Sequence, residues 1–407
     1  MRTIQSHPER FTISRNAVPR VALVLAGIAP LLAAPFAGAT VLPEERADLM
    51  YHRYDGGDVT VDGPSVLVRK NIGDKVSVSA NYYTDFVSSA SIDVQTSASP
   101  YKETRNQYSL STDVLNGKAL YSLGYIRSSE SDYKADTAFA GVSQSLFGDL
   151  TTISFGYRYG DNEIGRNVAG TLDPNFKEQM KTQGFSAGLS QILTRSMILS
   201  FNYEVVTDEG FLRSPYRSVR YLESATTQAV QSEVYPRTRT SNAGSLRGKY
   251  FLPWRAAAEL GYRYYTDTWG VRGQTADLGY THPKGKWTFE GSVRYYTQQR
   301  ANFYQDLFPR RDFANFLSRD KELATYDNVT LSVGATYDFH IPRVAWIDKS
   351  SASIRYSFLT VKYDDFRDAT KSFGKFGVLP DEPLAPGTEP LYKLDASVLQ
   401  LFMSIWF

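Results

Sequence analysis

The sequence predicts an all-β protein: a single transmembrane antiparallel up-and-down β-barrel of about 16 strands with both termini periplasmic. Three observations predict this fold: long segments in which apolar and polar residues alternate, connections that are alternately short and long, and a last strand that ends on phenylalanine. A soluble β-sandwich would show the same alternation. Its strands are usually about 5–6 residues long, whereas these run to roughly 10–16, and a sandwich has no reason to alternate its connection lengths.

The first 39 residues are predicted to be a secretory signal peptide. Four arginines precede an apolar stretch from Val21 to Phe36, and the small-x-small site Ala37-Gly38-Ala39 follows it. The alternative is a membrane-spanning helix, but this stretch is broken by two prolines and falls short of the roughly 20 residues that span a bilayer. Residues 40–407 are therefore expected to form the barrel.

Each predicted strand has one apolar and one polar face. Near residue 80, for example, Val76, Val78 and Tyr82 alternate with Ser77 and Ser79, because successive side chains of a strand point to opposite faces. Tyr and Phe gather near strand ends, as they do in the aromatic girdles of membrane barrels. The predicted strands are 47–55, 58–70, 74–88, 103–115, 118–129, 133–147, 149–160, 180–192, 196–207, 238–252, 255–268, 271–281, 286–302, 323–340, 350–364 and 392–407.

The connections between these strands fall into two classes. Those after even-numbered strands are brief, as at Asn116-Gly117 and Gly148-Asp149, whereas the long ones all follow odd-numbered strands. Short periplasmic turns and long external loops are typical of outer-membrane barrels, so the cell outer membrane is the expected location and its lipid an expected partner. The long connections are residues 89–102, 161–179, 208–237, 303–322 and 365–391.

The last strand has apolar residues at alternate positions and ends on Met403, Ile405 and Phe407. This ending resembles the C-terminal signal by which bacterial outer-membrane proteins are recognised. It predicts the barrel assembly machinery as a partner.

The polar strand faces are expected to line a lumen, since sixteen strands leave room for water. They carry seven basic and eight acidic residues, which predicts weak ion selectivity. One interpretation is a wet wall held by ion pairs, and the other is a ladder of charges that orients a solute. The lumen residues chosen as candidates are Arg158, Glu204, Glu259, Arg263, Glu290 and Arg294.

The longest connections are rich in arginine and aromatic residues. Apolar side chains in a connection of this length need somewhere to bury, so we expect these connections to fold inward as a constriction that would favour anions modestly. The alternative is a surface loop with its arginines paired to nearby carboxylates. The candidate constriction residues are Arg217, Arg220, Tyr221, Arg237, Arg239, Arg310, Arg311 and Arg319.

Nothing in the sequence indicates catalysis. There is no cysteine, and beyond residue 40 the histidines are His52, in the first predicted strand, and His282 and His340, near predicted turns. None has the spacing of a zinc protease, and no nucleophile motif occurs. We therefore expect no enzyme activity, no cofactor and no metal. The formal charge of +2 gives no indication of nucleic-acid binding.

Several strings resemble a family of Gram-negative outer-membrane proteins that is carried as a domain of unknown function. The resemblance implies a barrel in the outer membrane but no established substrate or site residue. Members of that family tend to neighbour flavin-transfer and thioredoxin-like proteins, so it also implies periplasmic redox proteins as partners. The strings are 63–70, 76–83, 207–212, 215–221, 234–243, 266–270 and 318–323.

The sequence thus predicts an outer-membrane channel or transporter for small solutes, narrowed by arginine- and aromatic-rich external loops. The alternative function is a non-conducting barrel that serves as a surface assembly or docking partner in a redox-linked envelope system.

Overall fold

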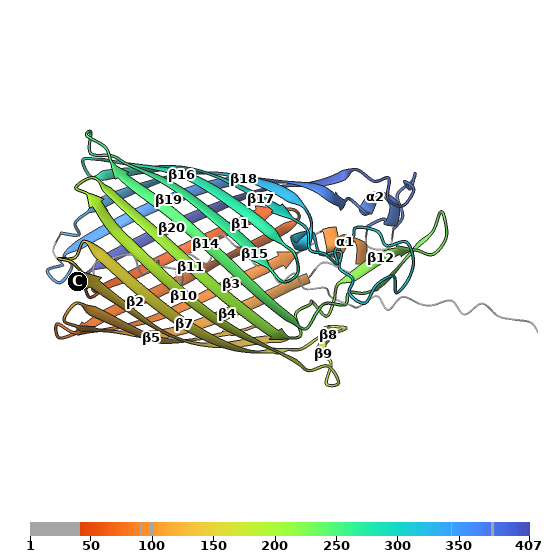
Figure 1. The fold of residues 1–407 in the computed structure, drawn as a ribbon, viewed down its shortest axis with the longest axis horizontal. Coiled ribbons are helices and arrows are strands. Elements are labelled where there is room, and N and C mark those ends of the chain that lie inside the picture. Colours follow the sequence, from red (N-terminus) through yellow and green to blue (C-terminus); the bar gives the residue numbers. More distant parts are fainter. Residues whose placement is uncertain (1–40, 90–91, 98–100, 343, 376–377) are drawn as a thin grey trace, which may run out of the picture.

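Sixteen strands of the computed structural model close into one antiparallel barrel (Figure 1). The structure describes residues 41–89, 92–97, 101–342, 344–375 and 378–407, so the predicted signal peptide lies outside the described residues. The barrel strands are β1 (Arg46–Gly56), β2 (Val59–Ile72), β3 (Val76–Ser89), β4 (Tyr101–Asn116), β5 (Ala119–Ser129), β6 (Tyr133–Leu146), β7 (Thr151–Ile164), β10 (Glu178–Thr194), β11 (Met197–Gly210), β14 (Thr238–Phe251), β15 (Ala257–Asp267), β16 (Arg272–Lys284), β17 (Trp287–Gln299), β18 (Tyr326–Phe339), β19 (Lys349–Arg367) and β20 (Leu391–Trp406).

The first and last strands pair with each other and close the sheet. Arg46 of β1 is the register partner of Trp406 of β20, and the pairing continues as far as Gly56 and Ala396. Closure leaves the barrel without an open edge, which is the condition for a sheet to cross lipid. The predicted fold class and strand count are confirmed, and both ends of the sheet lie at the end of the barrel with the short turns. A periplasmic position for that end stays a prediction.

Smaller elements occupy the long connections at the other end, which we call the mouth. They were not predicted, since each is only a few residues long. They are helix α1 (Ile92–Ser97), hairpin β8 (Asn167–Val168) with β9 (Thr171–Leu172), hairpin β12 (Ser218–Leu222) with β13 (Gln228–Ser232), a 3₁₀ turn (Lys321–Leu323) and helix α2 (Thr370–Phe373).

The outer face of the barrel is apolar. Leu123, Leu260 and Val333 are each more than 60% exposed, and exposed apolar or aromatic side chains occur at alternate positions along the strands. Soluble monomers rarely expose so much contiguous apolar surface, and a band of this kind is what lipid-facing strands present. No helix in the described part of the chain is long and apolar enough to span a membrane.

Six outward-facing tyrosines form a belt on the mouth side of this apolar face. Each phenol donates a hydrogen bond to an amide or carboxylate oxygen on the next strand. The acceptor residue lies two positions closer to the mouth than the residue that is the tyrosine's register partner. Tyrosine suits a membrane interface because its ring is apolar and its hydroxyl polar. The pairs are Tyr51–Asp62 (2.9 Å), Tyr82–Asn106 (2.8 Å), Tyr125–Asp136, Tyr203–Asn242 (2.7 Å), Tyr262–Gln274 (2.9 Å) and Tyr295–Asp327 (3.0 Å).

Candidate functional site

The connection between β11 and β14, residues 211–237, crosses the mouth of the barrel, and we call it the strap. Its first end is held on the β5–β7 side of the rim. There the Tyr216 hydroxyl donates to the Asp132 carboxylate and accepts from the Asn167 backbone N–H at 2.5 Å. The Phe211 ring packs edge-on against Phe176 at 5.5 Å between centroids.

A few residues further along the strap, carboxylates from two other connections hold two of its arginines. Arg220 Nη1 lies 2.5 Å from Glu389 Oε1, in the β19–β20 connection, and Arg220 Nη2 pairs with Asp306, in the β17–β18 connection. Arg217 pairs with Asp320. In strand order the β6–β7 and β18–β19 pairs lie half a barrel apart, so the strap contacts connections that come from opposite sides of the barrel.

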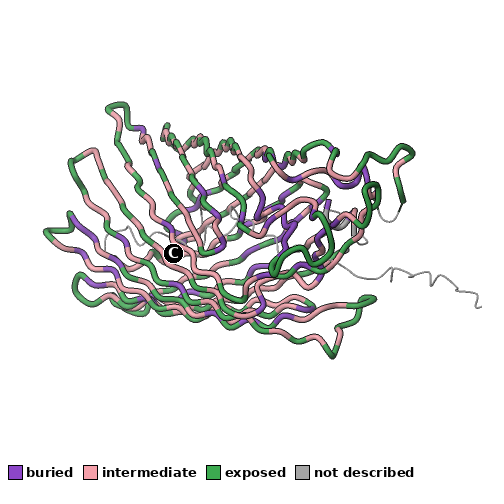
Figure 2. Tube along the Cα trace, turned by 45° about the vertical axis from the view of Figure 1, so that its right-hand side comes forward, coloured by how far each residue is buried: buried purple, intermediate pink, exposed green. Residues whose placement is uncertain are grey.

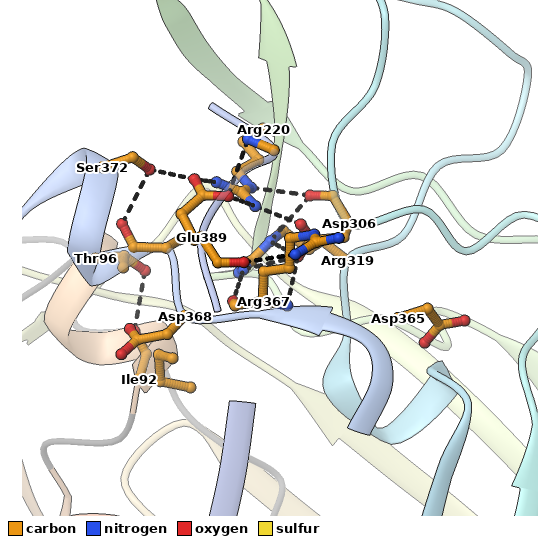
Figure 3. Close-up of polar contacts among 12 residues, drawn as sticks. Ile92, Thr96, Arg220, Asp306, Arg319, Asp365, Arg367, Asp368, Ser372 and Glu389 are labelled. Atoms are coloured by element: carbon orange, nitrogen blue, oxygen red, sulfur yellow. Dashed lines mark hydrogen bonds and ion pairs between the residues drawn. The ribbon is translucent and has the colours of Figure 1, made fainter. Parts of the chain in front are cut away.

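Arg220, Asp306, Arg319 and Glu389 form a buried cluster that joins three connections (Figure 3). The Arg220 side chain is 4% exposed and that of Glu389 is fully buried. Arg319 donates from Nε to Asp306 Oδ1 at 3.1 Å, and its guanidinium lies 4.4 Å from the centroid of Phe366. Because a buried charge is costly unless it is paired, removing any one member leaves an uncompensated charge and should loosen all three connections.

The cluster shifts the pKa values of Glu389 and Arg220. Burial alone would raise the pKa of Glu389, but the hydrogen bonds from Arg220 and Ser372 outweigh it and hold that pKa below its ordinary value. Burial alone would lower the pKa of Arg220, but the charges of Asp306 and Glu389 outweigh it and raise that pKa. Both shifts favour the ionised pair, so the cluster is charged at neutral pH.

An apolar core lies beside the ion pairs and fixes them to the barrel. Trp269 packs edge-on against Tyr235 of the strap at 5.4 Å and against Phe303 at 5.2 Å. Tyr363 of β19 belongs to the same core, as does Ile92 of α1. Figure 2 shows buried positions where these connections meet. We call the strap, α1, α2 and the connections 300–325 and 368–390 together the cap.

The cap should loosen in acid. A carboxylate with a lowered folded-state pKa stabilises the fold above its ordinary pKa, and this stabilisation is lost as the pH falls through the lowered value. We therefore expect the strap to be protected from hydrogen–deuterium exchange at pH 7 and to lose protection below about pH 4, after correction for intrinsic exchange rates. In Glu389→Gln the strap should be less protected at pH 7 and change less with pH. Equal protection of the wild-type strap at pH 3 and pH 7 would contradict this assignment.

On the inner wall, charged side chains from two strands meet over a glycine of the strand that lies between them. Arg247 on β14, Gly261 on β15 and Asp277 on β16 are successive register partners, and Arg247 Nη2 lies 3.2 Å from Asp277 Oδ1. Strands are about 4.8 Å apart, so the two charged residues start about two spacings apart and meet over the glycine. An added Cβ at Gly261 would lie 1.8 Å from the Asp277 carboxylate.

The same arrangement, which we call a rung, occurs twice more. His52 Nε2 lies 2.8 Å from Asp85 Oδ1 across Gly63. In the third rung, Arg355 pairs with Glu290 across Gly334. Each rung holds its polar groups against the wall.

The structure places the predicted lumen residues on this wall. Glu290 and Arg294 belong to rungs or touch them, and Glu259 lies 3.3 Å from Arg247. Arg158 pairs with Glu204 at 2.8 Å. All these strand positions alternate with the apolar residues of the outer face.

The predicted constriction residues divide into two groups. Arg217, Arg220, Tyr221 and Arg319 are buried in the cap, and the three arginines are paired with carboxylates. The remaining four lie apart from that cluster. Arg239 pairs with Asp267 at 2.6 Å, and Arg237 lies 3.5 Å from Glu178 with its side chain 70% exposed. Arg310 and Arg311 are exposed.

Sequence reasoning missed the carboxylates that matter most in the cap. Glu389 lies in a proline-rich segment and Asp306 in an aromatic one, and nothing in either segment marks the carboxylate as buried. Within the described residues no group of three or more His, Asp or Glu side chains is placed to hold a metal ion.

A family profile described as "Protein of unknown function (DUF3570)" matches residues 22–344. No curated protein matches the sequence. The chain is similar in structure to a bacterial polysaccharide outer membrane secretin, at 9% identity and a TM-score of 0.47 over 90% of this chain and 100% of that one. It is also similar to a loop-deletion mutant of OmpT, an outer membrane protein of Vibrio cholerae, at 10% identity and a TM-score of 0.40 over 89% of this chain and 98% of that one. A third similar structure is the CymD monoaromatic hydrocarbon channel, at 10% identity and a TM-score of 0.42 over 92% of this chain and 91% of that one.

Proposed function

For this chain, which belongs to the DUF3570 family of proteins of unknown function, we propose an outer-membrane passage for small solutes whose mouth the cap closes. The observation that carries this proposal is the strap, which is tied to connections that come from opposite sides of the barrel. A connection that merely covered the rim would need no tie across the opening.

The inner wall supports a water-filled passage behind the cap. The side chains of Arg158, Arg294 and Arg355 are 46–49% exposed although they face the interior. Charged side chains that remain half exposed inside a closed sheet lie against water. A barrel of sixteen strands is wide enough to hold that water.

The location follows from the outer surface. The apolar face and the tyrosine belt support a position in a membrane with the belt at one interface, and the ending on Phe407 supports recognition by the barrel assembly machinery. We expect residues 40–407 to fractionate with the outer membrane and to migrate faster on gels before boiling than after it, because closed barrels resist unfolding. Recovery as a soluble periplasmic protein would contradict the barrel's membrane position.

The proposed passage is tested by solute flux. Wild-type protein reconstituted in liposomes should admit small sugars and salts slowly, and liposomes with heat-denatured protein should admit none. Flux should increase when the strap is released by the variant described in the Discussion. If assembled barrels of both forms pass no solute, the function is instead the non-conducting docking barrel.

A further inference from the structure

Four basic side chains lie close together on one part of the inner wall, and we call them the basic strip. They are Arg247 and Lys249 on β14, Arg263 on β15 and Arg294 on β17. Each alternates with outward-facing apolar neighbours such as Leu246, so all four face the interior.

The strand register aligns the strip along the barrel. Arg247 and Arg294 share one row with Asp277. Lys249 lies one row closer to the short turns, opposite Glu259, and Arg263 lies one row closer to the mouth. Rows on one face are two residues apart, or about 7 Å along a strand, so the three rows of the strip extend over about 14 Å along the strands.

The strip has more cations than carboxylates. Arg247 lies within 3.3 Å of both Glu259 and Asp277, and Arg294 lies 3.7 Å from the same Asp277. Four basic groups therefore share two acidic ones. Outside the strip, Arg158 has its own carboxylate in Glu204, so the excess positive charge is local.

The cations of the strip also stand closer to the solvent than its carboxylates. The side chains of Arg247 and Arg294 are 46% and 49% exposed, whereas those of Glu259 and Asp277 are 34% and 20% exposed. Arg263 stacks on Tyr265, with 5.7 Å from guanidinium to ring centroid. A solute in the lumen would meet guanidinium and ammonium groups first.

We propose that the basic strip binds small oxyanions, carboxylate or phosphate groups, as they move through the lumen. The proposal rests on the barrel being a passage. Arginine forks match the two oxygens of such groups, and the rows let an anion transfer from one cation to the next. Anion preference arises here and not in the cap, because the cap arginines already hold carboxylates. The numbers of basic and acidic residues on the whole inner wall are nearly equal, so the total count does not show this local excess of positive charge.

The test uses planar bilayers and the strap-released background, in which current can be measured. In a gradient of KCl the reversal potential should show anion preference, and inorganic phosphate should reduce the chloride current. The double variant Lys249→Gln with Arg263→Gln removes the two cations that hold no carboxylate of their own in the strip. The phosphate concentration that halves the chloride current should be about tenfold higher in this variant, which corresponds to a loss of about 1.4 kcal/mol in binding free energy.

The matched control is Arg158→Gln with Arg355→Gln, which removes the same charge from other parts of the wall and should keep the phosphate block. The charge-preserving pair Lys249→Arg with Arg263→Lys should keep it as well. All forms are first checked for heat-modifiable mobility. The anion preference should weaken at 1 M salt, where the Debye length falls to about 3 Å.

The outcomes separate the two proposals. Cation preference, or equal loss of phosphate block in the strip variant and the matched control, would overturn the basic strip while the passage stands. If the strip variant loses block by acetate but keeps block by phosphate, the strip binds carboxylates only, and the proposal is supported in that narrower form. Absence of current in every strap-released form would overturn the passage itself.

Discussion

Arg220→Met should open the barrel. The substitution leaves the Glu389 carboxylate buried without the guanidinium that pairs with it, while Asp306 keeps Arg319 as a cationic partner. Breaking a buried pair in this way costs about 3–5 kcal/mol. At about 1.4 kcal/mol per factor of ten, the closed cap should lose at least a hundredfold in population relative to open forms. Single-channel recordings should therefore change from rare, small openings in wild type to sustained conductance in the variant.

The matched control is Arg237→Met, which removes an arginine from the same strap. That side chain is 70% exposed and its pairing with Glu178 is long, at 3.5 Å, so its loss should change the recordings little. Tyr216→Phe removes the tie to Asp132, four residues before Arg220 in the strap, and should also raise conductance. If Arg220→Met and wild type conduct alike, the strap does not close the mouth.

Gly63→Ala should prevent assembly of the barrel. An added Cβ at this position would lie 1.8 Å from the Thr84 carbonyl oxygen, a backbone atom of the adjacent strand that cannot move without breaking the ladder. It would also stand under the rung from His52 to Asp85. Overpacking of an interior by a single methyl costs about 1–3 kcal/mol even where side chains can adjust, and here backbone must shift.

The expected result for Gly63→Ala is loss of the heat-modifiable form from the outer membrane and accumulation of unfolded or degraded chain. Gly291→Ala is the control, because Gly291 also lies in a barrel strand and an added Cβ there meets nothing within 4 Å. Assembly of Gly63→Ala at the level of Gly291→Ala would show that β2 and β3 can separate at this row.

The strands could be predicted because each carries its own signal. The alternation in 76–83 depends only on side chains within one strand. Along the whole strand, lipid favours apolar side chains on the outer face and water favours polar side chains on the inner face. The boundaries differ from the structure by a few residues, as at β19, which the structure extends to Arg367 beyond the predicted end at 364. Strand ends depend on what the connections contact, which the strand itself does not encode.

The cap and the rungs could not be predicted in the same way. Arg220 was chosen because it is an arginine in a long aromatic connection, but its partner Glu389 is 169 residues away. The rung from Arg247 to Asp277 requires the registers of three strands and a glycine in the middle one. Such contacts are properties of pairs and triplets of segments, and no single segment shows them.

The seam between β1 and β20 sets an order for folding. Arg46 cannot meet Trp406 until the last strand has been delivered, so the sheet closes only when the whole chain is present, and contacts this distant in sequence form slowly. The cap depends on the same event, because Glu389 lies two residues before the start of β20. The barrel thus closes its wall and its mouth with the same end of the chain. On the proposal that the cap closes the passage, a nascent barrel that lacks β20 is open at both places, and its completion and its sealing are a single step.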